Sequence, residues 1–307
     1  MNDFVLQTFQ LTKYYHKTPA LDHLNLCVPK GCVYGLLGRN GSGKTTAIKL
    51  ILGLLAPTAG RAEVVGHPSD NLPPSLRSRI GYITEGHHLE RWMTIRELEH
   101  FQKAFYPDQW DRRFFAEMLD YFELSPKRKI KTLSNGQRAQ VNLALTLAAN
   151  PELLIMDDPT LGLDAAVCRQ FLEGMVHLIQ KEGRTILFSS HILSDVERVA
   201  DRIAVIDKGV LRADCTLEEF RMQIRKYLFE FPQPNIPVDT LPGLIHSKQN
   251  QQMLEATVVK TPEEAIYEWA RRHQAAVEPV PMSIEDQFIE FTGPKQAQKL
   301  FSWEMPV

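Results

Sequence analysis

The sequence lacks a long hydrophobic run. Its most apolar stretches, residues 50–56 and 153–156, are far shorter than the roughly 20 residues that a membrane-spanning helix needs. The N-terminus also lacks the basic start and apolar core of a signal peptide. We therefore expect a cytoplasmic protein, and any membrane span associated with its work must come from another chain.

Net charge and cysteine content are low as well. Lys and Arg number 35 against 37 Asp and Glu, a formal net charge of −2, so no basic excess predicts a specific nucleic-acid partner. The basic run at residues 127–131 is expected to be a solvated face rather than a binding site for nucleic acid or anionic lipid. Without C-x-x-C spacing, reduced thiols rather than a zinc or disulfide framework are expected for the four cysteines, Cys27, Cys32, Cys168 and Cys215.

Short apolar runs alternate with helical patterns, which predicts an α/β fold with a mainly parallel sheet. The predicted core strands are residues 32–37, 79–83, 153–156, 185–189 and 202–206. Residues 1–217 are predicted to form one domain with a helical insert at about 86–150, where a Thr94–Glu97 capping box starts a helix that carries Phe101 and Phe105. Residues 218–307, which begin with a helix and a strand followed by a proline-rich linker at 232–242, predict a small C-terminal α+β domain.

A phosphate-binding loop follows the first of these strands. Its sequence matches G-x-x-x-x-G-K-[ST] and lies between a strand and a helix, the context that this pattern requires. Backbone N–H groups and the helix dipole bind phosphate, Lys44 adds a positive charge, and the Thr45 hydroxyl can ligate Mg²⁺. A glycine-rich hairpin with an incidental lysine would not have both flanks in this order. The expected nucleotide-binding residues are Gly38, Arg39, Asn40, Gly41, Ser42, Gly43, Lys44, Thr45 and Thr46.

Four further segments resemble the ABC ATPase family, in the family's order across residues 4–217. Residues 133–137 (LSNGQ) resemble its LSGGQ signature, 153–160 its Walker B strand, 161–164 its D-loop and 188–191 its switch-histidine segment. The resemblance implies a P-loop NTPase fold of ABC ATPase type with a helical subdomain, and hydrolysis of ATP with Mg²⁺.

Three polar residues are expected to carry the hydrolytic chemistry. Asp157 ends an apolar strand, where its carboxylate can hold Mg²⁺ together with Thr45. Asp158 can orient or deprotonate the attacking water, and His191 can contact the terminal phosphate. In the family the residue after the Walker B aspartate is usually glutamate. Asp158 is shorter by one methylene, and we therefore expect modest turnover.

Glu85 stands where many members of the family carry the glutamine of the Q-loop. We expect Glu85 to be a catalytic residue with Asp158 and His191 and, as a carboxylate, to ligate Mg²⁺, although it adds negative charge near the γ-phosphate and lacks the amide N–H donor. The other interpretation is an ordinary exposed residue next to a loop. The adjacent pair His87-His88 has no further ligands nearby, so we expect surface residues and no transition metal.

The signature segment predicts a partner subunit. Ser134, Gly136 and Gln137 open a helix whose N–H groups can bind an anion far from the phosphate loop of the same chain. In the family this segment completes the ATP site of the opposing subunit, which implies a homodimer, or a pair with a paralogue, around two nucleotides. Tyr15 occupies the family's position for an aromatic that stacks on adenine; Tyr14 is a substitute, and either ring can instead cap the sheet edge.

The resemblance implies an ATPase subunit that powers a separate integral membrane permease from the cytoplasmic face of the membrane. Residues 282–289 resemble a helix near the end of exporting members, which favours an ABC-2-type exporter. The aromatic side chains of the insert are expected mostly in the core, with some forming a groove for a cytoplasmic helix of the permease. The alternative is a soluble ABC ATPase acting on ribosomes or DNA, against which the single cassette and the absence of long heptad repeats speak.

Overall fold

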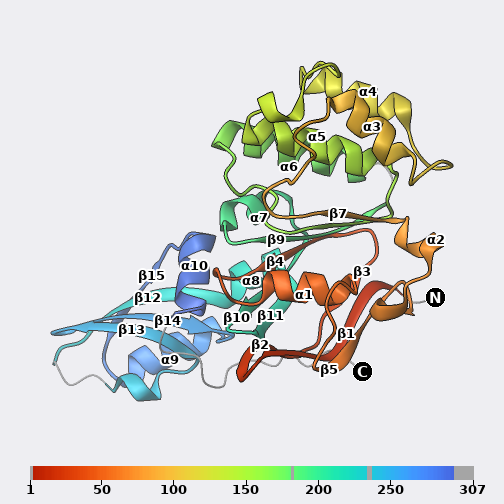
Figure 1. Ribbon diagram of the computed structural model, residues 1–307. Helices are drawn as coiled ribbons and strands as arrows, with labels where there is room; N and C mark the ends of the chain where they lie inside the picture. The colour runs from red at the N-terminus through yellow and green to blue at the C-terminus, as the bar shows by residue number, and fades with distance from the viewer. Residues whose placement is uncertain (1–2, 181–182, 234–236, 294–307) are drawn as a thin grey trace. The chain divides into compact units, whose positions relative to one another are not determined.

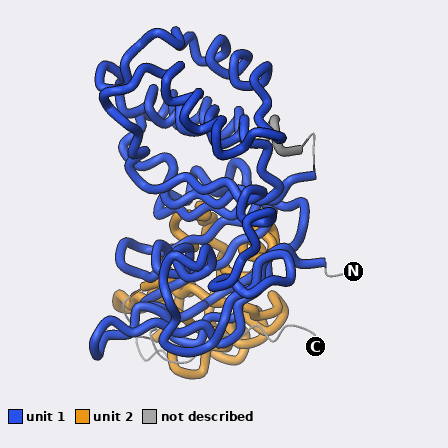
Figure 2. The backbone as a smooth tube through the Cα atoms, turned by 45° about the vertical axis from the view of Figure 1, so that its right-hand side comes forward, with its two compact units in different colours: residues 1–214 blue, residues 215–307 orange. Residues whose placement is uncertain are grey.

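The computed structural model describes residues 3–180, 183–233 and 237–293. By its internal contacts the chain divides into two compact units, residues 1–214 and 215–307, which Figure 2 colours separately. The predicted boundary after residue 217 lies close to this division, and separate roles for the two parts remain a prediction.

A six-stranded sheet forms the centre of the first unit (Figure 1). The expected α/β class is confirmed, because the neighbouring pairs β10–β4, β4–β9, β9–β8 and β8–β7 are all parallel. Nearly every residue of the three middle strands is buried, as a sheet covered on both faces requires. The strand order is β11 (Val210–Thr216), β10 (Arg202–Asp207), β4 (Val33–Leu37), β9 (Thr185–Ser190), β8 (Leu153–Met156) and β7 (Ile80–Ile83).

The first unit also contains an antiparallel sheet, which was not predicted from the sequence. Its long strand β1 buries Val5, Leu6, Thr8, Leu11 and Thr12 and leaves its last residues exposed, without a strict alternation. Val5, Leu6 and Leu11 of this strand pack in the same core cluster as α1 (Lys44–Ile51), which follows β4. The strands are β1 (Phe4–Tyr15), β2 (Thr18–Leu24), β3 (Cys27–Pro29), β5 (Ala59–Val64) and β6 (His67–Pro68).

Helices gather at one end of the first unit, at the top of Figure 1. Thr94 starts the first of them with the predicted capping box, and Ser134 starts α5 with another. The helix after Thr94 ends at Lys103, so the expectation that it carries Phe105 is wrong. The helices here are α3 (Ile95–Lys103), α4 (Arg112–Tyr121), η2 (Ile130–Thr132), α5 (Asn135–Ala148) and α6 (Ala165–Gln180).

The aromatic side chains of this helical region divide between core and surface. Phe115 and Phe122 are buried as expected. Four others are between 47% and 68% exposed, so the expectation of a mostly buried set is only partly right: Trp92, Phe101, Phe105 and Tyr121.

The remaining helices described in the first unit are η1 (Ser69–Asn71), α2 (Pro74–Arg77) and α7 (Leu193–Val199).

The second unit is a four-stranded antiparallel sheet with helices, in strand order β13–β14–β12–β15. Of the expected linker at residues 232–242, residues 234–236 lie outside the described part of the chain, and Leu241 is buried in the core cluster of this unit. The strand β13 was not predicted. The elements are α8 (Leu217–Gln223), β12 (Ile224–Glu230), η3 (Val238–Thr240), β13 (Leu244–Asn250), β14 (Met253–Val259), α9 (Glu263–Arg272), β15 (Ala276–Val280) and α10 (Ile284–Phe291). Within the part of the chain that the structure describes, no helix is both long and apolar enough to cross a bilayer.

The core of the second unit depends on an aromatic cluster around Phe229. Its ring is fully buried and meets the Trp269 ring edge-on at a centroid distance of 5.2 Å. We expect Phe229→Ala to lower the free energy of unfolding of this unit by about 3–5 kcal/mol, since it removes the ring and leaves a cavity. Denaturant unfolding measures the effect, with the 43%-exposed Met253→Ala as the control. A loss below about 1 kcal/mol would contradict this packing.

Candidate functional site

The phosphate loop, residues 38–45, connects buried β4 to α1. Gly43 caps the helix with φ +112°, and a Cβ at this position would lie 2.5 Å from the Ala20 carbonyl oxygen, so only glycine fits. No side chain caps α1, and no acidic residue occupies its first turn. The first N–H groups of the helix are therefore left for an anion.

Two side chains of the loop, those of Lys44 and Ser42, are buried and have the chemistry to bind a phosphate. Lys44 is only 5% exposed, and its ammonium group donates to the Gly38 carbonyl at 2.9 Å and lies 3.7 Å from Asp158 Oδ2. Ser42 is 4% exposed, and its buried hydroxyl has no hydrogen-bond partner among the described residues. A buried ammonium and an unsatisfied hydroxyl suit the oxygens of a phosphate.

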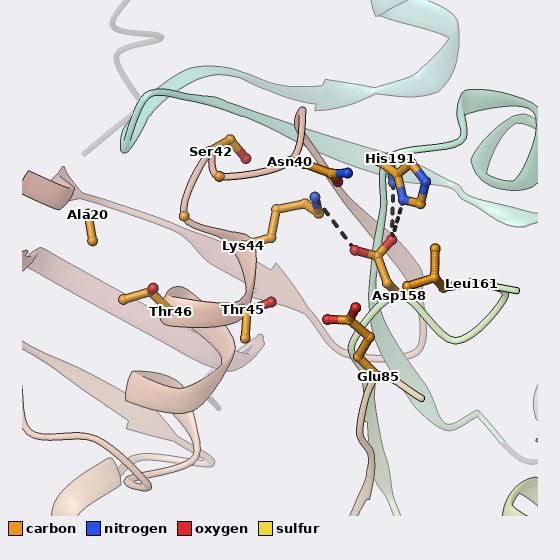
Figure 3. A pocket seen from close by; sticks show the side chains of 12 residues that line it. Ala20, Asn40, Ser42, Lys44, Thr45, Thr46, Glu85, Asp158, Leu161 and His191 are labelled. Carbon is orange, nitrogen blue, oxygen red and sulfur yellow. Dashed lines mark hydrogen bonds and ion pairs between the residues drawn. The ribbon is translucent and has the colours of Figure 1, made fainter. Parts of the chain in front are cut away.

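A pocket of about 340 Å³ opens over this loop (Figure 3). The structure brings together here three predicted residues from distant parts of the sequence, Glu85, Asp158 and His191, with most of the phosphate loop. The lining residues are Ala20, Asn40, Gly41, Ser42, Gly43, Lys44, Thr45, Thr46, Glu85, Asp158, Leu161 and His191.

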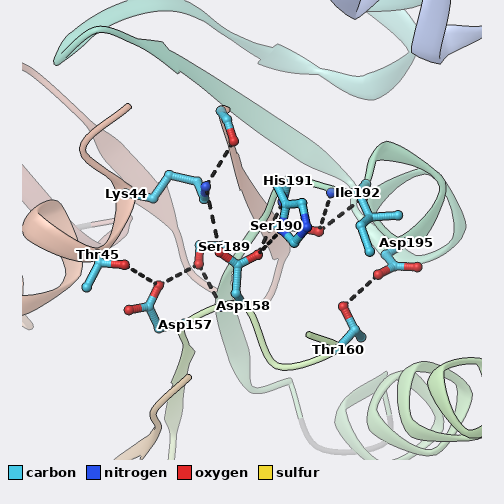
Figure 4. A network of polar contacts seen from close by, with 11 residues as sticks. Lys44, Thr45, Asp157, Asp158, Thr160, Ser189, Ser190, His191, Ile192 and Asp195 are labelled. Atoms are coloured by element: carbon cyan, nitrogen blue, oxygen red, sulfur yellow. Dashed lines mark hydrogen bonds and ion pairs between the residues drawn. The ribbon is translucent and has the colours of Figure 1, made fainter. Parts of the chain in front are cut away.

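Asp157 follows β8 and forms a network of hydroxyl contacts (Figure 4). Its Oδ1 accepts hydrogen bonds from Thr45 Oγ1 at 3.1 Å and from Ser189 Oγ at 2.8 Å, and the residue is 2% exposed. Thr45 and Asp157 were predicted to act together, and the structure brings them into contact. Ser189 was not predicted; its sequence signal is a serine within the wholly buried strand β9.

Asp158 adopts a left-handed backbone conformation with φ +43°, which aspartate tolerates better than most residues. Its Oδ1 accepts from the backbone N–H of His191 at 3.2 Å and lies 2.9 Å from His191 Nδ1. Because an ionised carboxylate only accepts hydrogen bonds, Nδ1 carries the proton. The side chain is thus held between His191 and Lys44, within the pocket (Figure 4).

His87 is buried, which corrects the expectation that both residues of the histidine pair lie on the surface. It is 4% exposed, and its Nε2 lies 2.7 Å from the Pro159 carbonyl oxygen. Burial lowers the pKa of His87 below its ordinary value, so the neutral ring donates its Nε2–H to Pro159. Its neighbour His88 is exposed. The segment that carries Glu85 is thereby tied to the segment that carries Asp158.

The signature segment lies outside this pocket. Ser134 Oγ accepts from the Gln137 backbone N–H at 3.1 Å, and Gln137 Oε1 accepts from Ser134 N–H at 3.2 Å. Gly136 does provide a close approach, but to α6 of the same chain, since a Cβ there would lie 2.9 Å from Val167 Cγ1. Ser134, Gly136 and Gln137 do not line the pocket.

Four other predicted residues, Tyr15, Gly38, Arg39 and Asp157, also lie outside the pocket lining. Tyr15 is 48% exposed and Tyr14 39%. Gly38 contributes its carbonyl oxygen to Lys44. In residues 3–180, 183–233 and 237–293, no three or more His, Cys, Asp or Glu side chains gather in a way that suits a metal ion.

The buried His87 predicts a pH dependence of stability. Its lowered pKa means that the unfolded chain binds a proton, with an ordinary pKa of about 6.5, before the folded chain does. The stability is therefore present above this pKa and falls as the pH is lowered. Urea denaturation at pH 7.5 and 5.5 should show that the free energy of unfolding falls more for the wild type than for His87→Asn on going to the lower pH. The His88→Asn variant should behave as the wild type. Parallel losses in wild type and His87→Asn would contradict the assignment.

Comparison with known proteins identifies related sequences over most of the chain. The family model described as ABC transporter matches residues 21–161. The bacitracin transport ATP-binding protein of Bacillus licheniformis is 35% identical over 227 residues, 73% of this chain and 74% of that protein. The daunorubicin/doxorubicin resistance ATP-binding protein of Streptomyces peucetius is also 35% identical, over 71% of this chain and 67% of that protein. An uncharacterized ABC transporter ATP-binding protein of Bacillus subtilis is 29% identical over 97% of this chain and 98% of that protein.

Solved structures share the fold of about 70% of the chain. The ATP-binding subunit of an ABC transporter superposes with a TM-score of 0.64 at 28% identity, covering 71% of this chain and 92% of that one. A dimeric ATP-binding cassette with bound ADP and phosphate superposes with a TM-score of 0.62 at 25% identity, covering 69% of this chain and 98% of that one. The phosphate loop, the paired aspartates and these relatives lead to one conclusion: the chain belongs to the ABC transporter family, as an ATP-binding ATPase subunit.

Proposed function

We propose that this ATPase powers a separate membrane permease of the ABC-2 exporter type from the cytoplasmic face of the membrane. One observation supports the energy-supplying role above the others: Lys44, Asp158, His191 and Glu85 meet in one pocket on the phosphate loop. The named functions of two relatives, in bacitracin transport and in daunorubicin/doxorubicin resistance, favour transport over work on ribosomes or DNA.

The donor set fits Mg²⁺ bound together with nucleotide. The Thr45 hydroxyl and the Asp157 carboxylate are 3.1 Å apart and both offer oxygen ligands, and Glu85 lines the pocket together with Thr45. Mg²⁺ in phosphate sites usually has one or two protein carboxylates and takes its other ligands from phosphate and water. When bound, it neutralises negative charge on the phosphate oxygens.

Hydrolysis is assigned to Asp158 and His191. The Asp158 carboxylate orients the attacking water and takes its proton, and His191 holds that carboxylate through its Nδ1–H and backbone N–H. Lys44 binds the outer phosphate oxygens as a point charge. Gly38 to Thr46 surround the phosphates, and Tyr15 stacks on the adenine.

A second copy of the chain, or a paralogue, completes each ATP site. The signature residues Ser134, Gly136 and Gln137 lie outside their own pocket, and in this proposal they contact the nucleotide held by the partner. The likeness to a dimeric cassette with bound ADP and phosphate supports this arrangement.

The exposed aromatic side chains provide the permease contact. Phe101 and Phe105 stack edge-on at a centroid distance of 5.3 Å while remaining 47% and 64% exposed. Exposed apolar groups of this size mark interaction surfaces. We assign them, with Trp92 and Tyr121, to a cytoplasmic helix of the permease, and the second unit to stabilising or regulating the dimer.

Purification of the tagged chain from detergent-solubilised membranes of its host tests the transporter assignment. Mass spectrometry should identify a multi-span membrane protein in comparable amount. A Phe101→Ala/Phe105→Ala variant should lose this partner, because its contact surface is removed, and should keep its own ATP binding. Co-purification of ribosomal or DNA-repair proteins without a membrane chain would refute the proposal.

The assignment of Asp158 predicts that two substitutions at this position both slow hydrolysis, for different reasons. Asp158→Asn should lower kcat about a hundredfold or more and leave nucleotide binding within about twofold, since the amide cannot take a proton. Asp158→Glu should also lower kcat, because the carboxylate is already held by His191 and Lys44 and an added methylene displaces it by about 1 Å. Steady-state ATPase assays measure both, with the exposed Asp120→Glu as control. Faster hydrolysis by Asp158→Glu would show that the site is not adapted to aspartate.

A further inference from the structure

Ser189 lies between the two acidic residues of the site and contacts both. It is fully buried at the end of β9. Its hydroxyl donates to Asp157 Oδ1 at 2.8 Å and accepts the backbone N–H of Asp158, also at 2.8 Å. A single oxygen atom therefore joins the carboxylate assigned to Mg²⁺ to the main chain of the residue assigned to water (Figure 4).

The direction of these hydrogen bonds is fixed. An ionised carboxylate has no donor and a backbone N–H has no acceptor, so the one hydroxyl proton of Ser189 must point to Asp157. Thr45 donates to the same Oδ1 at 3.1 Å. Oδ1 of Asp157 is thus occupied by two hydroxyls, and in the part of the chain that the structure describes Oδ2 accepts no hydrogen bond. The orientation of this carboxylate depends on Ser189.

The contact with Asp158 acts on the backbone. At φ +43° this residue is in a conformation that side-chain-bearing residues seldom adopt, so a fixed N–H partner is needed to hold it. A buried N–H without a partner costs about 1–3 kcal/mol. The Asp158 carboxylate is set 2.9 Å from His191 Nδ1 and 3.7 Å from Lys44 Nζ by this backbone conformation.

We propose that Ser189 is a positioning residue for hydrolysis: its hydroxyl orients Asp157 for Mg²⁺ and holds the main chain of Asp158 so that its carboxylate reaches the water. The inference rests on the roles proposed above for Asp157 and Asp158. It assigns two functions to one atom, and both should fail together when that atom is removed.

The neighbouring residue provides a matched control. Ser190 is equally a buried serine of β9, 1% exposed, but its hydroxyl donates to the Ile192 carbonyl and accepts the Ile192 N–H, both at 3.0 Å. Ser190→Ala removes a buried hydroxyl from the same strand without touching either aspartate. A purely structural role would make the two alanine variants behave alike.

The test compares Ser189→Ala, Ser190→Ala and wild type in three measurements. These are the binding of a fluorescent ADP analogue in EDTA and over a Mg²⁺ titration, steady-state ATPase kinetics, and thermal unfolding. For Ser189→Ala we expect the half-saturating Mg²⁺ concentration for analogue binding to rise about 10–100-fold, the usual effect of losing a residue that orients a metal ligand. Its kcat should fall on the order of tenfold to a hundredfold, while binding in EDTA stays within about twofold. Ser190→Ala should keep the wild-type Mg²⁺ midpoint.

A rescue variant distinguishes the loss of the Ser189 hydroxyl from other effects of the substitution. Ser189→Thr restores a hydroxyl on the same carbon and should recover most of the Mg²⁺ affinity. Should Ser189→Ala fail to fold, Ser189→Cys, whose thiol is a weak donor of similar shape, is measured in its place with the same expected rise. Similar stability losses in Ser189→Ala and Ser190→Ala, with wild-type Mg²⁺ midpoints and kcat in both, would overturn the role inferred for Ser189 and leave the proposed function standing. If Asp157→Ala also left the Mg²⁺ midpoint unchanged, the metal assignment itself would fall, and the inference with it.

Discussion

The parallel register of β4, β9 and β8 is the constraint on which the site depends. Leu37 at the end of β4 is opposite Ser190 of β9, and Phe188 of β9 is opposite Met156 of β8. The phosphate loop, His191 and the two aspartates each follow one of these strands within a residue or two. A shift of one residue in either pair would displace the groups on one strand relative to those on its neighbour by about 3.3 Å, which is enough to break a hydrogen bond between them. Packing of apolar residues on both faces of the sheet therefore fixes the geometry of the polar groups at its edge.

The sequence identified the parts of this site that have a local signature. The phosphate loop needs a fixed glycine spacing, and Asp157 ends a recognisable apolar strand, so both were predictable from their neighbours. Ser189 could not be predicted in this way, because a serine in a buried strand matches no motif. Its role follows only from its hydrogen bonds to Asp157 and Asp158, which the sequence does not show. His87 was misjudged for a similar reason: its partner, the Pro159 carbonyl, lies 72 residues away. The antiparallel sheet around β1 was also missed, although β1 and β2 form a local hairpin with Tyr15 opposite Thr18; only the pairing of β1 with β5 joins more distant segments.

The fold shows the same division between local and distant information. Capping boxes at Thr94, Ser134, Thr216 and Ser283 start four helices as their residue types indicate. The proline-rich stretch at residues 232–242 suggested a linker by composition, yet Leu241 is buried in the core of the second unit. Composition reports the conformational preference of a segment, and only the three-dimensional contacts decide whether that segment separates two bodies or completes one of them.

The hydrogen bond between His87 and Pro159 has a mechanical consequence. It joins the loop after β7 to the loop after β8 at a point one residue from Asp158, through a buried ring that is neutral and therefore has a single N–H to donate. A displacement of residues 84–88 must therefore either break this 2.7 Å hydrogen bond or move the main chain beside Asp158. The segment that carries Glu85 and the main chain beside Asp158 are thus coupled by a contact between two residues that do not line the pocket.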